Sequence, residues 1–557
     1  MILAEAAGSF TVSPETFRLL APEIILVAAA LVAYLAGAFA GFRHGWILAI
    51  AAIVTALAAA GRQPIDAVSS VVCIDGFASF VRWLVLVTGG LLVLVQSGDS
   101  RLGVRRPTGT CEEAGTFLLL LAGLSLVACA SDLVLLFVAL ELVSIPTYVL
   151  LGLARQTAKG QEATLKYFFL SLVASAFFLY AIVCLYGIGG STKLADVAAA
   201  LQSPDGPGRA VATAVLPIAI GMAMAGAAFR LAAVPMHFYA PDVYEGTSSP
   251  MAALLSTLPK VAGVVVLARV LAIAGGSGTG AATEWSGLFW QVTAVLAAVT
   301  MTVGNVMALL QSNLRRLLAC SSIAHAGYML VGIAVAAATD PGEIGGWIGL
   351  DGLSAVLFYL ATYAFATVGV FAAITYLGHR WPVWTANAPR PPREEVSTVA
   401  DLDGLSGTNP VAAFAITVFL LSLAGIPPLP GFWGKLSLVT AALEVDWGLA
   451  IDFGGRRAWF LGLAVVLVLN AAIAAAYYLR LIAAMYFKST DRGVQADGGL
   501  ASGVAMLLCL AAVAMVTFQP GGLFEAAGRA GAAGNEIHAA LPIAPGEQAG
   551  SLETASR

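Results

Sequence analysis

The chain is 557 residues long, 59% of them hydrophobic and only 11% charged, with a formal net charge of −4. Soluble domains carry roughly 25% charged residues, so this composition excludes a soluble protein and predicts an integral membrane protein. The small net charge says little about partners, and no nucleic-acid partner is expected. Six scattered cysteines form no C-x-x-C pair, so we expect no disulfide, zinc site or iron–sulfur cluster on this chain.

Fourteen apolar segments follow one another along the sequence, most of them near the roughly 17–25 residues that cross a bilayer. They lie near residues 22–41, 45–60, 75–96, 115–131, 133–154, 164–188, 209–239, 249–273, 286–310, 317–338, 346–377, 409–445, 457–487 and 501–518. The first is interpreted as a retained span, because a basic region and a small-residue cleavage site do not accompany it. The predicted fold class is therefore an all-α integral membrane protein with about 14 transmembrane helices.

Two of these segments, 209–239 and 409–445, are too long for one straight helix and contain proline-rich breaks. The breaks read VPMHFYAPDVYEG (Val234–Gly246) and GIPPLPGFWGK (Gly425–Lys435). Broken helices at corresponding places in the two halves of a transporter mark its transport site. Each break comes near the fourth span of its half, which predicts two repeats of five helices. The expected domains are helices 1–3 in residues 1–114, the first repeat in 115–274, the second repeat in 286–487, and helix 14 in 501–518.

The distribution of lysine and arginine between the connections predicts the orientation. Thirteen of these residues lie in connections after odd-numbered spans, and five lie in connections after even-numbered spans. Because cytoplasmic loops carry the excess of positive charge, the odd connections are expected in the cytoplasm and both termini outside. The connection Gly378–Asp403 is predicted as a solvated linker, and the Ala/Gly-rich residues 521–557 as a disordered tail.

Charged residues inside the spans are the candidate functional groups. Glu141 lies near the midpoint of LVLLFVALELVSIPTYVLLGL (Leu133–Leu153), where an isolated carboxylate costs roughly 2.5–3.5 kcal/mol. Only six of the 28 Lys and Arg residues are lysines, and three of them, Lys166, Lys260 and Lys435, lie in or at apolar segments. A buried lysine can release and recapture a proton, whereas an arginine stays protonated. This pattern is typical of a chain of proton sites.

Several of these residues also have a simpler interpretation. Lys166 could begin its helix with the ammonium among the headgroups, and Lys435 could be a helix-end cation. His237 beside the first break and His325 in CSSIAHAGYMLVG could each either pack or relay protons. The polar side chains that could hold water between them are Tyr244, Tyr328, Ser321 and Ser322. Motifs for ATP, dinucleotides, haem or catalytic zinc do not appear, so the energy for uphill transport would come from a gradient or a partner.

Several segments resemble the antiporter-like membrane subunits of respiratory complex I, the NADH–quinone oxidoreductase. They are FRLAAVPMHFYAPDVYEG, NLRRLLACSSIAHAGYMLVG, AVLFYLATYAFATVGVFAA, SLAGIPPLPGFWGK and NAAIAAAYYLRLIAAMYF. The stretch PDVYEG is the most discriminating, because it favours the subunit N branch over its sister subunits. The resemblance runs from about Pro22 to Pro520.

The resemblance implies a fourteen-helix fold with inverted repeats of spans 4–8 and 9–13, each containing one broken helix. It implies a proton-translocating subunit of the bacterial cell inner membrane with both termini in the periplasm. It also implies that NADH, FMN, iron–sulfur clusters and quinone bind to partner subunits and that no cofactor binds to this chain. The expected partners are the other membrane-arm subunits, the lipid bilayer and protons.

The resemblance carries over to individual residues. Glu141 matches the family's fifth-span glutamate, Lys166 its sixth-span lysine, Lys260 its eighth-span lysine and Lys435 its twelfth-span lysine. Arg230 stands where the family has a seventh-span lysine. We expect Arg230 and Glu141 to pair within about 4 Å, directly or through one water. Opening that pair would leave the arginine repelling the ammonium group of Lys260. Closing it would restore the proton affinity of Lys260.

Three rival functions share these features. The chain could belong to a multisubunit cation/proton antiporter, although PDVYEG argues against this. It could serve a membrane-bound hydrogenase or formate-oxidising complex. It could also be a structural membrane-arm subunit whose proton path has been lost, as the arginine at position 230 would then indicate. The presence of Glu141, Lys260 and Lys435 argues against complete loss.

Overall fold

The structure is a computed structural model that describes most of the chain. The described residues are 14–42, 44–69, 71–99, 110–155, 157–202, 209–274, 283–339, 350–380, 394–446, 455–489 and 494–535. Within these ranges, twelve helices are long and apolar enough to cross a membrane, and Gly45–Ala60 and Pro410–Ala424 are shorter apolar helices. Each of the fourteen predicted segments overlaps one of these helices, and the predicted fold class of an all-α membrane protein is confirmed.

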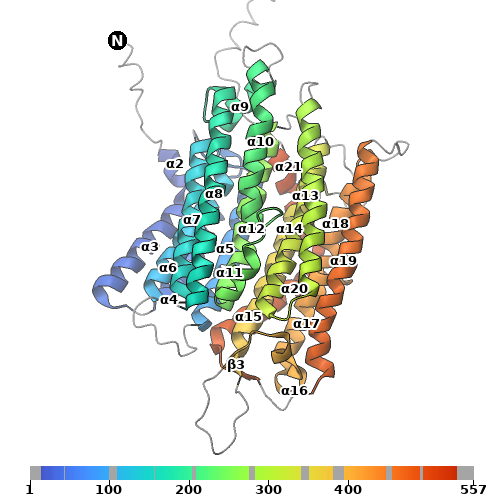
Figure 1. Cartoon of the computed structure of the whole chain (residues 1–557). Coiled ribbons are helices and arrows are strands. Elements are labelled where there is room, and N and C mark those ends of the chain that lie inside the picture. Colours follow the sequence, from blue (N-terminus) through green and yellow to red (C-terminus); the bar gives the residue numbers. More distant parts are fainter. Residues whose placement is uncertain are drawn as a thin grey trace, which may run out of the picture.

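The helices run roughly side by side along one direction (Figure 1). In the first half they are α2 (Pro14–Leu19), α3 (Ala21–Ala40), α4 (Gly45–Ala60), α5 (Gly76–Asp99), α6 (Thr110–Cys129), α7 (Leu133–Ala154), α8 (Ala158–Gly189), α9 (Leu194–Gln202), α10 (Arg209–Leu231), α11 (Ala240–Gly246) and α12 (Ser249–Ala274). In the second half they are α13 (Thr283–Leu309), α14 (Leu314–Ala338), α15 (Gly352–Leu377), α16 (Leu405–Thr408), α17 (Pro410–Ala424), α18 (Pro430–Glu444), α19 (Arg456–Phe487), α20 (Gly499–Phe518) and α21 (Pro520–Asn535).

Both predicted breaks interrupt the helices. In the first, α10 ends at Leu231 and the short α11 follows only at Ala240. In the second, α17 ends at Ala424 and α18 begins at Pro430. Prolines in both segments account for the stops, because the residue before a proline avoids helical geometry and proline donates no backbone hydrogen bond. The two breaks are therefore confirmed, whereas the inverted repeats stay a prediction.

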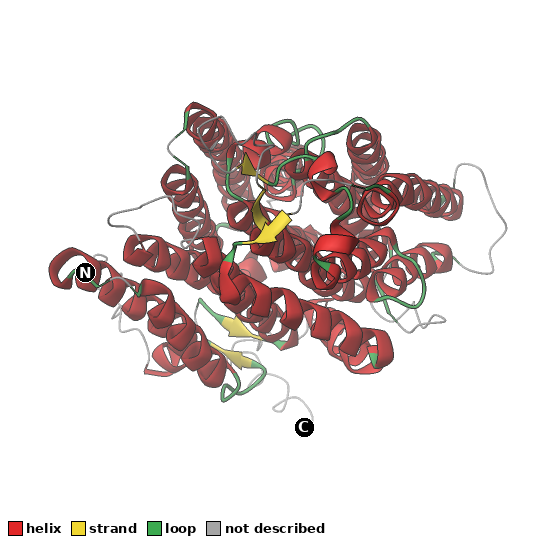
Figure 2. Cartoon of the chain, turned by 90° about the horizontal axis from the view of Figure 1, so that it is seen from below, coloured by secondary structure: helices red, strands yellow, loops and turns green. Residues whose placement is uncertain are grey.

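Three helices form the centre of the bundle. All of the apolar stretch of α12 and α14 and 94% of that of α15 are buried, against 22% for α3 and 33% for α19 and α20. Figure 2 shows the bundle along the helix axes, seen from below. Glycines allow the close packing of α14 on α13, because a Cβ on Gly327 would lie 2.5 Å from the backbone nitrogen of Met301. The outer helices turn their apolar side chains outward, as lipid-facing helices do.

The predicted solvated linker Gly378–Asp403 is partly wrong. Its described ends form β3 (Gly378–Arg380), β4 (Glu394–Glu395) and the 3-10 helix η1 (Val399–Leu402). β3 pairs antiparallel with both β4 and β5 (Val494–Ala496), which ties the linker to the connection before α20. Residues 381–393 lie outside the described part. A second small ladder joins β1 (Ala67–Val68) to β2 (Cys73–Ile74).

The predicted disordered tail is also wrong in its first part, because residues 520–535 form α21, which packs against α5 and α15. Ala527 and Ala530 are buried, and Phe524 stacks on Phe358 with ring centroids 4.1 Å apart. The small residues that suggested disorder allow α21 to approach its neighbouring helices closely. A Cβ on Gly531 would lie 2.0 Å from Ser354 Oγ. Residues 536–557 lie outside the described part.

The packing of α21 gives a test with a matched control. Gly531→Ala should loosen α21, because overpacking a fitted contact costs about 1–3 kcal/mol. Trypsin should then cleave after Arg529, inside α21, several-fold faster. Gly528→Ala, one turn away, should leave the rate unchanged or slow it, since the nearest atom to its Cβ would be Leu350 Cδ2 at 3.6 Å. Equal cleavage rates in the two variants would contradict the docked helix.

Candidate functional site

The helix that carries Glu141 is shaped by three local features. The Asp132 side chain caps α7, accepting from the backbone N–H groups of Val134 at 2.8 Å and Leu135 at 3.1 Å. Pro146 lies inside α7 and provides no N–H for the carbonyl of Leu142. Opposite this carbonyl lies Gly123 of α6, where a Cβ would be 2.9 Å from the Leu142 oxygen. The backbone beside Glu141 is thus closely packed and locally irregular.

Glu141 is half-buried between α7 and α8. Its Oε1 accepts a hydrogen bond from Ser175 of α8. Arg230, at the end of α10, is buried and donates from Nη1 to Ser144 Oγ at 3.1 Å. Ser144 is one turn beyond Glu141 on α7, and its own hydroxyl donates to the carbonyl of Leu140 at 2.9 Å.

The direct form of the expected contact between Glu141 and Arg230 does not occur, and pairing through one water stays a prediction. Among the ion pairs of the described residues, defined by an N···O distance of 4.0 Å or less, these two groups do not occur together. Arg230 instead reaches the same helix face through Ser144. The guanidinium has five N–H donors and needs oxygen acceptors when it is buried, and the hydroxyl lies nearer to it along α7.

Lys260 lies at the centre of the bundle, with 1% of its surface exposed. Its Nζ donates to the carbonyl of Leu231 at 2.8 Å and to the carbonyl of Ser322 at 2.7 Å. Leu231 is the last residue of α10, so its carbonyl has no intrahelical partner. The negative end of the α10 dipole also points at the ammonium. The first break therefore supplies the oxygen that holds a buried cation.

Lys435 is held in the same way at the second break. Its Nζ donates to the carbonyls of Leu423 at 3.0 Å and Ala424 at 2.9 Å, which are the last two residues of α17. Gly425 follows with φ of +84°, and a Cβ there would lie 2.9 Å from Lys435 Cδ. Glycine is thus favoured both by the left-handed backbone and by the lysine beside it. Both buried lysines bind the carboxyl end of a half-helix.

One face of α14 joins the surroundings of the two lysines. Ser322, His325 and Tyr328 follow at intervals of three residues, so they lie along one side of the helix. The carbonyl of Ser322 accepts from Lys260, and the ring of Tyr328 lies 4.9 Å from Lys435 Nζ. His325 lies between them and is buried. The sequence-based candidates His325 and Tyr328 therefore lie between Lys260 and Lys435.

His325 has a hydrogen-bond partner on each ring nitrogen. Nδ1 lies 2.6 Å from the hydroxyl of Tyr359 in α15, and Nε2 lies 3.0 Å from the hydroxyl of Tyr478 in α19. Tyr478 also bonds Ser321 Oγ. A histidine bonded on both sides can take up a proton on one nitrogen and release it from the other. This arrangement is suited to proton transfer between α15 and α19.

The network also contains tyrosines and asparagines that were not among the candidates from the sequence. Tyr363 of α15 donates to Ser322 Oγ at 3.0 Å, and Asn305 of α13 donates to the Tyr328 hydroxyl at 3.1 Å. Asn305 also donates to Asn470 Oδ1 of α19 at 3.0 Å. Phenols spaced by four residues in FYLATYAFA and lone amides within apolar spans are the signal that could have identified them.

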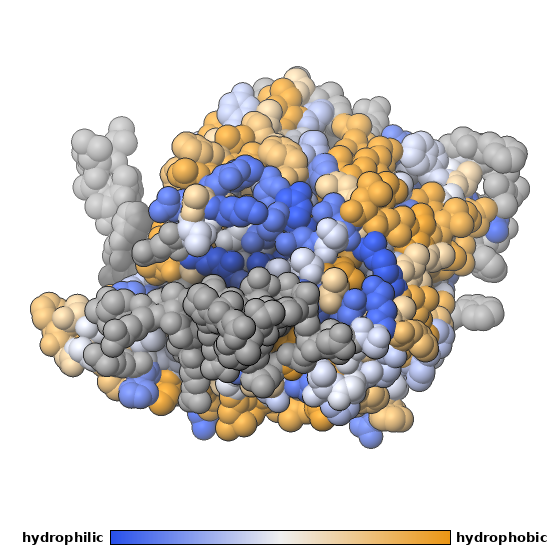
Figure 3. Space-filling view, turned by 60° about the horizontal axis from the view of Figure 1, so that its bottom comes forward, coloured by the Kyte–Doolittle hydropathy of each residue, from blue (hydrophilic) through white to orange (hydrophobic). Residues whose placement is uncertain are grey.

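Lys166 lies apart from the buried lysines. It pairs with Asp242 at 2.7 Å and Glu162 at 2.8 Å, with 39% of its side chain exposed. Arg316 contacts both Asp242 at 2.7 Å and Glu245 at 2.8 Å. We call the set Lys159, Glu162, Lys166, Asp242, Glu245 and Arg316 the ionic cluster. Figure 3 shows hydrophilic residues gathered at this end of the bundle.

The electrostatics of the ionic cluster favour charged carboxylates. Burial raises the pKa of Asp242, but hydrogen bonds from Lys166 and Arg316 outweigh it and hold that pKa below its usual range. The Arg155 and Arg315 guanidinium groups do the same for Glu395, against the effect of burial. This end of the bundle thus keeps fixed charges of both signs at neutral pH.

His237 does not join either group. It lies between α10 and α11 and is half-buried, and its Nδ1 has no hydrogen-bond partner among the described residues. Tyr244 is buried in α11. Within the described ranges, no group of three or more His, Cys, Asp or Glu side chains is placed to hold a metal ion.

The contact between Arg230 and Ser144 can be tested by a double-mutant cycle. Ser144→Ala should cost about 1–3 kcal/mol of unfolding free energy in detergent micelles, because it leaves a buried N–H without an acceptor. In an Arg230→Met background the same change should cost less by about 0.5–3 kcal/mol.

Thr257→Val is the control, since Thr257 Oγ1 donates only to carbonyls of its own helix. It should cost the same in both backgrounds. The contact is refuted if Ser144→Ala also costs the same in both.

Comparisons with known proteins agree with the resemblance in the sequence. The family described as "NADH:quinone oxidoreductase/Mrp antiporter, TM" matches residues 130–460. NADH-quinone oxidoreductase subunit N of Trichlorobacter lovleyi is 38% identical over 76% of this chain and 77% of its own length. The protein of the same name from Myxococcus xanthus is 36% identical over 91% of this chain and 95% of its own length.

Solved structures share the fold. A chain of respiratory complex I from Thermus thermophilus is 28% identical, with a TM-score of 0.68 and coverage of 91% of this chain and 99% of that one. A chain of the Mrp complex from Dietzia sp. DQ12-45-1b has a TM-score of 0.71 with coverage of 93% and 97%, but at 20% identity it shows the fold alone. This chain therefore belongs to the NADH-quinone oxidoreductase subunit N family, within the antiporter-like membrane subunits of respiratory complex I.

Proposed function

We propose that this chain translocates protons as a membrane-arm subunit of NADH-quinone oxidoreductase, driven by electron transfer on other subunits. The observation that carries the proposal is the placement of Lys260 and Lys435. Each ammonium is buried at the carboxyl end of a half-helix, and α14 contacts Lys260 through Ser322 and Lys435 through Tyr328. Buried lysines in apolar surroundings exchange protons near neutral pH, and intramembrane charges mark ion paths.

Arg230 and Glu141 would act as the switch at the first break. Arg230 precedes Leu231, whose carbonyl holds Lys260, so a movement of the end of α10 changes both contacts together. Because arginine keeps its proton, Arg230 would act by changing position and not by titrating. Glu141 would respond through its contact with α8, where Ser175 donates to it.

Proton transfer would then run along α14 from Lys260 to Lys435. His325 would pass the proton between the hydroxyls of Tyr359 and Tyr478, which bond its two nitrogens. Tyr328 would stabilise the cationic form of Lys435, since ammonium groups bind the face of an aromatic ring. Lys166 would act at the surface as a fixed cation of the ionic cluster, and His237 is not part of this route.

The remaining features follow from family membership. The chain is a subunit of a translocase, and its partners are other subunits of complex I in a bacterial membrane. Flavin, iron–sulfur clusters and quinone would bind to those partners. The ionic cluster lies at one end of the bundle together with Arg155 and Arg315, two described cations of the odd-numbered connections, and we assign this end to the cytoplasm and both termini to the periplasm.

The rival functions have less support. This chain is 38% and 36% identical in sequence to two complex I subunits, whereas it is 20% identical to the chain of the Mrp complex. A decayed, purely structural subunit would have no reason to retain two buried ammonium groups, since each costs roughly 2.5–3.5 kcal/mol at the centre of a bilayer.

Lysine-to-arginine changes test the proposal. Lys260→Arg and Lys435→Arg keep the positive charge but not the release of a proton, so each should lower proton pumping by about tenfold or more, which corresponds to about 1.4 kcal/mol. Pumping is measured as acidification of proteoliposomes during NADH oxidation, after checking that the complex has assembled.

Lys159→Arg is the matched control, because the Lys159 side chain is 76% exposed in the ionic cluster and should tolerate the change. Full pumping by both buried-site variants would show that the two sites provide only fixed positive charge.

A further inference from the structure

A cavity opens at the end of the bundle that carries the ionic cluster, between the end of α13 and the end of α19. Its volume is about 480 Å³. The residues that line it are Leu310, Gln311, Ser312, Val399, Arg480, Ala483, Ala484, Phe487 and Lys488. The membrane-crossing parts of α13 and α19 end at Leu309 and Phe487. The cavity therefore lies at the level where the hydrocarbon core meets the headgroups.

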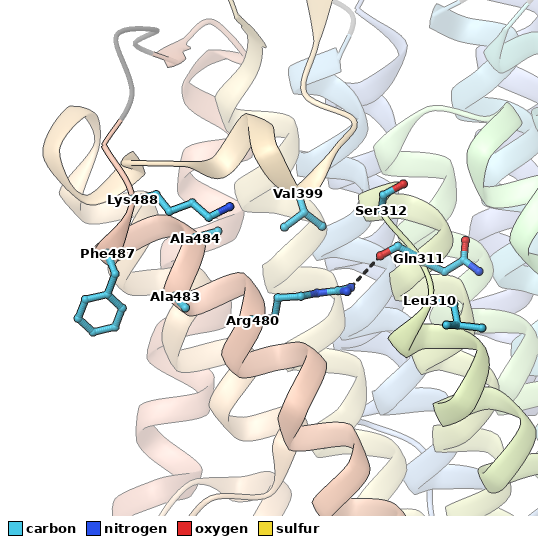
Figure 4. Close-up of a pocket in the computed structure, with 9 residues that line it drawn as sticks. All are labelled: Leu310, Gln311, Ser312, Val399, Arg480, Ala483, Ala484, Phe487 and Lys488. Atoms are coloured by element: carbon cyan, nitrogen blue, oxygen red, sulfur yellow. Dashed lines mark hydrogen bonds between the residues drawn. The ribbon is translucent and has the colours of Figure 1, made fainter.

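Two cations extend from α19 into this space, as Figure 4 shows. Arg480 donates from Nη1 to the carbonyl of Leu309 at 3.0 Å and from Nη2 to the carbonyl of Gln311 at 2.7 Å. These contacts fix the guanidinium and leave it with further N–H donors, since it has five in all. Lys488 has 59% of its side chain exposed. Carboxylates are not among the residues that line the cavity.

The rim of the cavity also carries exposed apolar side chains. Leu310 is 81% exposed and Phe487 is 86% exposed, although both are large hydrophobic side chains. Contact of such side chains with water is unfavourable, whereas their contact with lipid acyl chains is favourable. The same small region therefore presents two cations beside exposed apolar side chains, which is the chemical pattern of a phospholipid with an anionic headgroup.

We propose that this cavity binds an anionic phospholipid. The phosphate would contact Arg480 and Lys488, and the acyl chains would lie along Leu310 and Phe487. Basic pockets between transmembrane helices are suited to anionic headgroups, and a planar guanidinium gives two-point recognition of phosphate. Asp403 Oδ1 lies 3.3 Å from Lys488 Nζ, so the lysine would turn from this carboxylate toward the lipid.

Binding here would hold the end of α19 against the turn between α13 and α14. Arg480 already bridges these elements through the two carbonyls of the turn. A phosphate on its free donors would fix the guanidinium further. α19 also carries Tyr478, which bonds His325, so the lipid would stabilise the element that positions one side of the central network.

The test uses photo-crosslinking in the assembled complex. Phe487 is replaced by benzoylphenylalanine, the complex is illuminated in membranes containing phosphatidylethanolamine and phosphatidylglycerol, and the crosslinked peptide is identified by mass spectrometry. Phosphatidylglycerol should be enriched over its share of the membrane. The same replacement at Phe518, which is 84% exposed at the other end of the bundle, should show the membrane average.

Charge variants identify the headgroup contacts. Arg480→Gln and Lys488→Gln should each reduce the enrichment at position 487 by about fivefold, because this is the contribution of one cation to the attraction of anionic lipid near a membrane surface. Lys193→Gln, an exposed cation at the opposite end, should leave it unchanged. Added inorganic phosphate should not reduce the enrichment.

Three outcomes would overturn the proposal. Equal lipid composition at positions 487 and 518 would show that the cavity does not select a headgroup. A crosslink to another polypeptide would assign this surface to a subunit contact. Displacement of the lipid signal by millimolar phosphate would assign the cations to a soluble anion. Each readout is independent of proton pumping, so failure of this proposal would leave the proposed function untouched.

Discussion

An ammonium group inside a membrane needs oxygen ligands from the protein, and this requirement organises the bundle. A lysine at the bilayer centre costs roughly 2.5–3.5 kcal/mol, while a hydrogen bond to a charged group contributes about 1.5–3 kcal/mol. Lys260 and Lys435 each have two such bonds, all to backbone carbonyls. Three of these four carbonyls, those of Leu231, Leu423 and Ala424, lie at the ends of the broken helices, where carbonyls lack intrahelical N–H partners, and the fourth, that of Ser322, lies within α14. The two breaks therefore provide three of the four ligands that make both cations tolerable.

The breaks also determine which contacts of the buried charges can change. The carbonyl of Leu231 belongs to a helix end, and helix ends move more easily than helix centres. Arg230 lies beside that carbonyl and holds Ser144 on α7, so the contacts of the cation and of the arginine are mechanically linked. Arginine at this position suits a switch that works by movement. The direct ion pair with Glu141 that the family resemblance suggested is not needed for such a switch.

The helices and the two breaks could be predicted from the sequence, because hydropathy and proline act locally. Lys260 and Lys435 could be identified for the same reason, as charges within apolar runs. Their ligands could not, since the backbone carbonyls of Leu231 and Leu423 have no signature in the side-chain pattern. For Lys166 the sequence left two interpretations open, a proton site and a helix-start cation among the headgroups, and the ionic cluster holds it at the surface. The sequence could not choose between these interpretations, because the distance of Lys166 from the start of α8 was not known.

The polar network around α14 was predicted only in part. His325 and Tyr328 were candidates, but their partners Tyr359 and Tyr478 come from helices far away in the sequence. Tyrosines in apolar spans are usually assigned to packing, and only the folded arrangement distinguishes a phenol that bonds a histidine. The helix α21 was missed because Ala and Gly suggest disorder in water, whereas here they allow contact with Ser354.

The central claim is that His325 transfers protons between the two buried lysines. His325→Gln tests it most directly, because glutamine can still bond Tyr359 and Tyr478 but cannot carry a proton at neutral pH. The measurement is the number of protons pumped per NADH oxidised in proteoliposomes, with His237→Gln as the control outside the network. The account predicts a lower ratio for the His325 variant and a normal ratio for the His237 variant. A normal ratio in both would contradict it and leave His325 with a packing role.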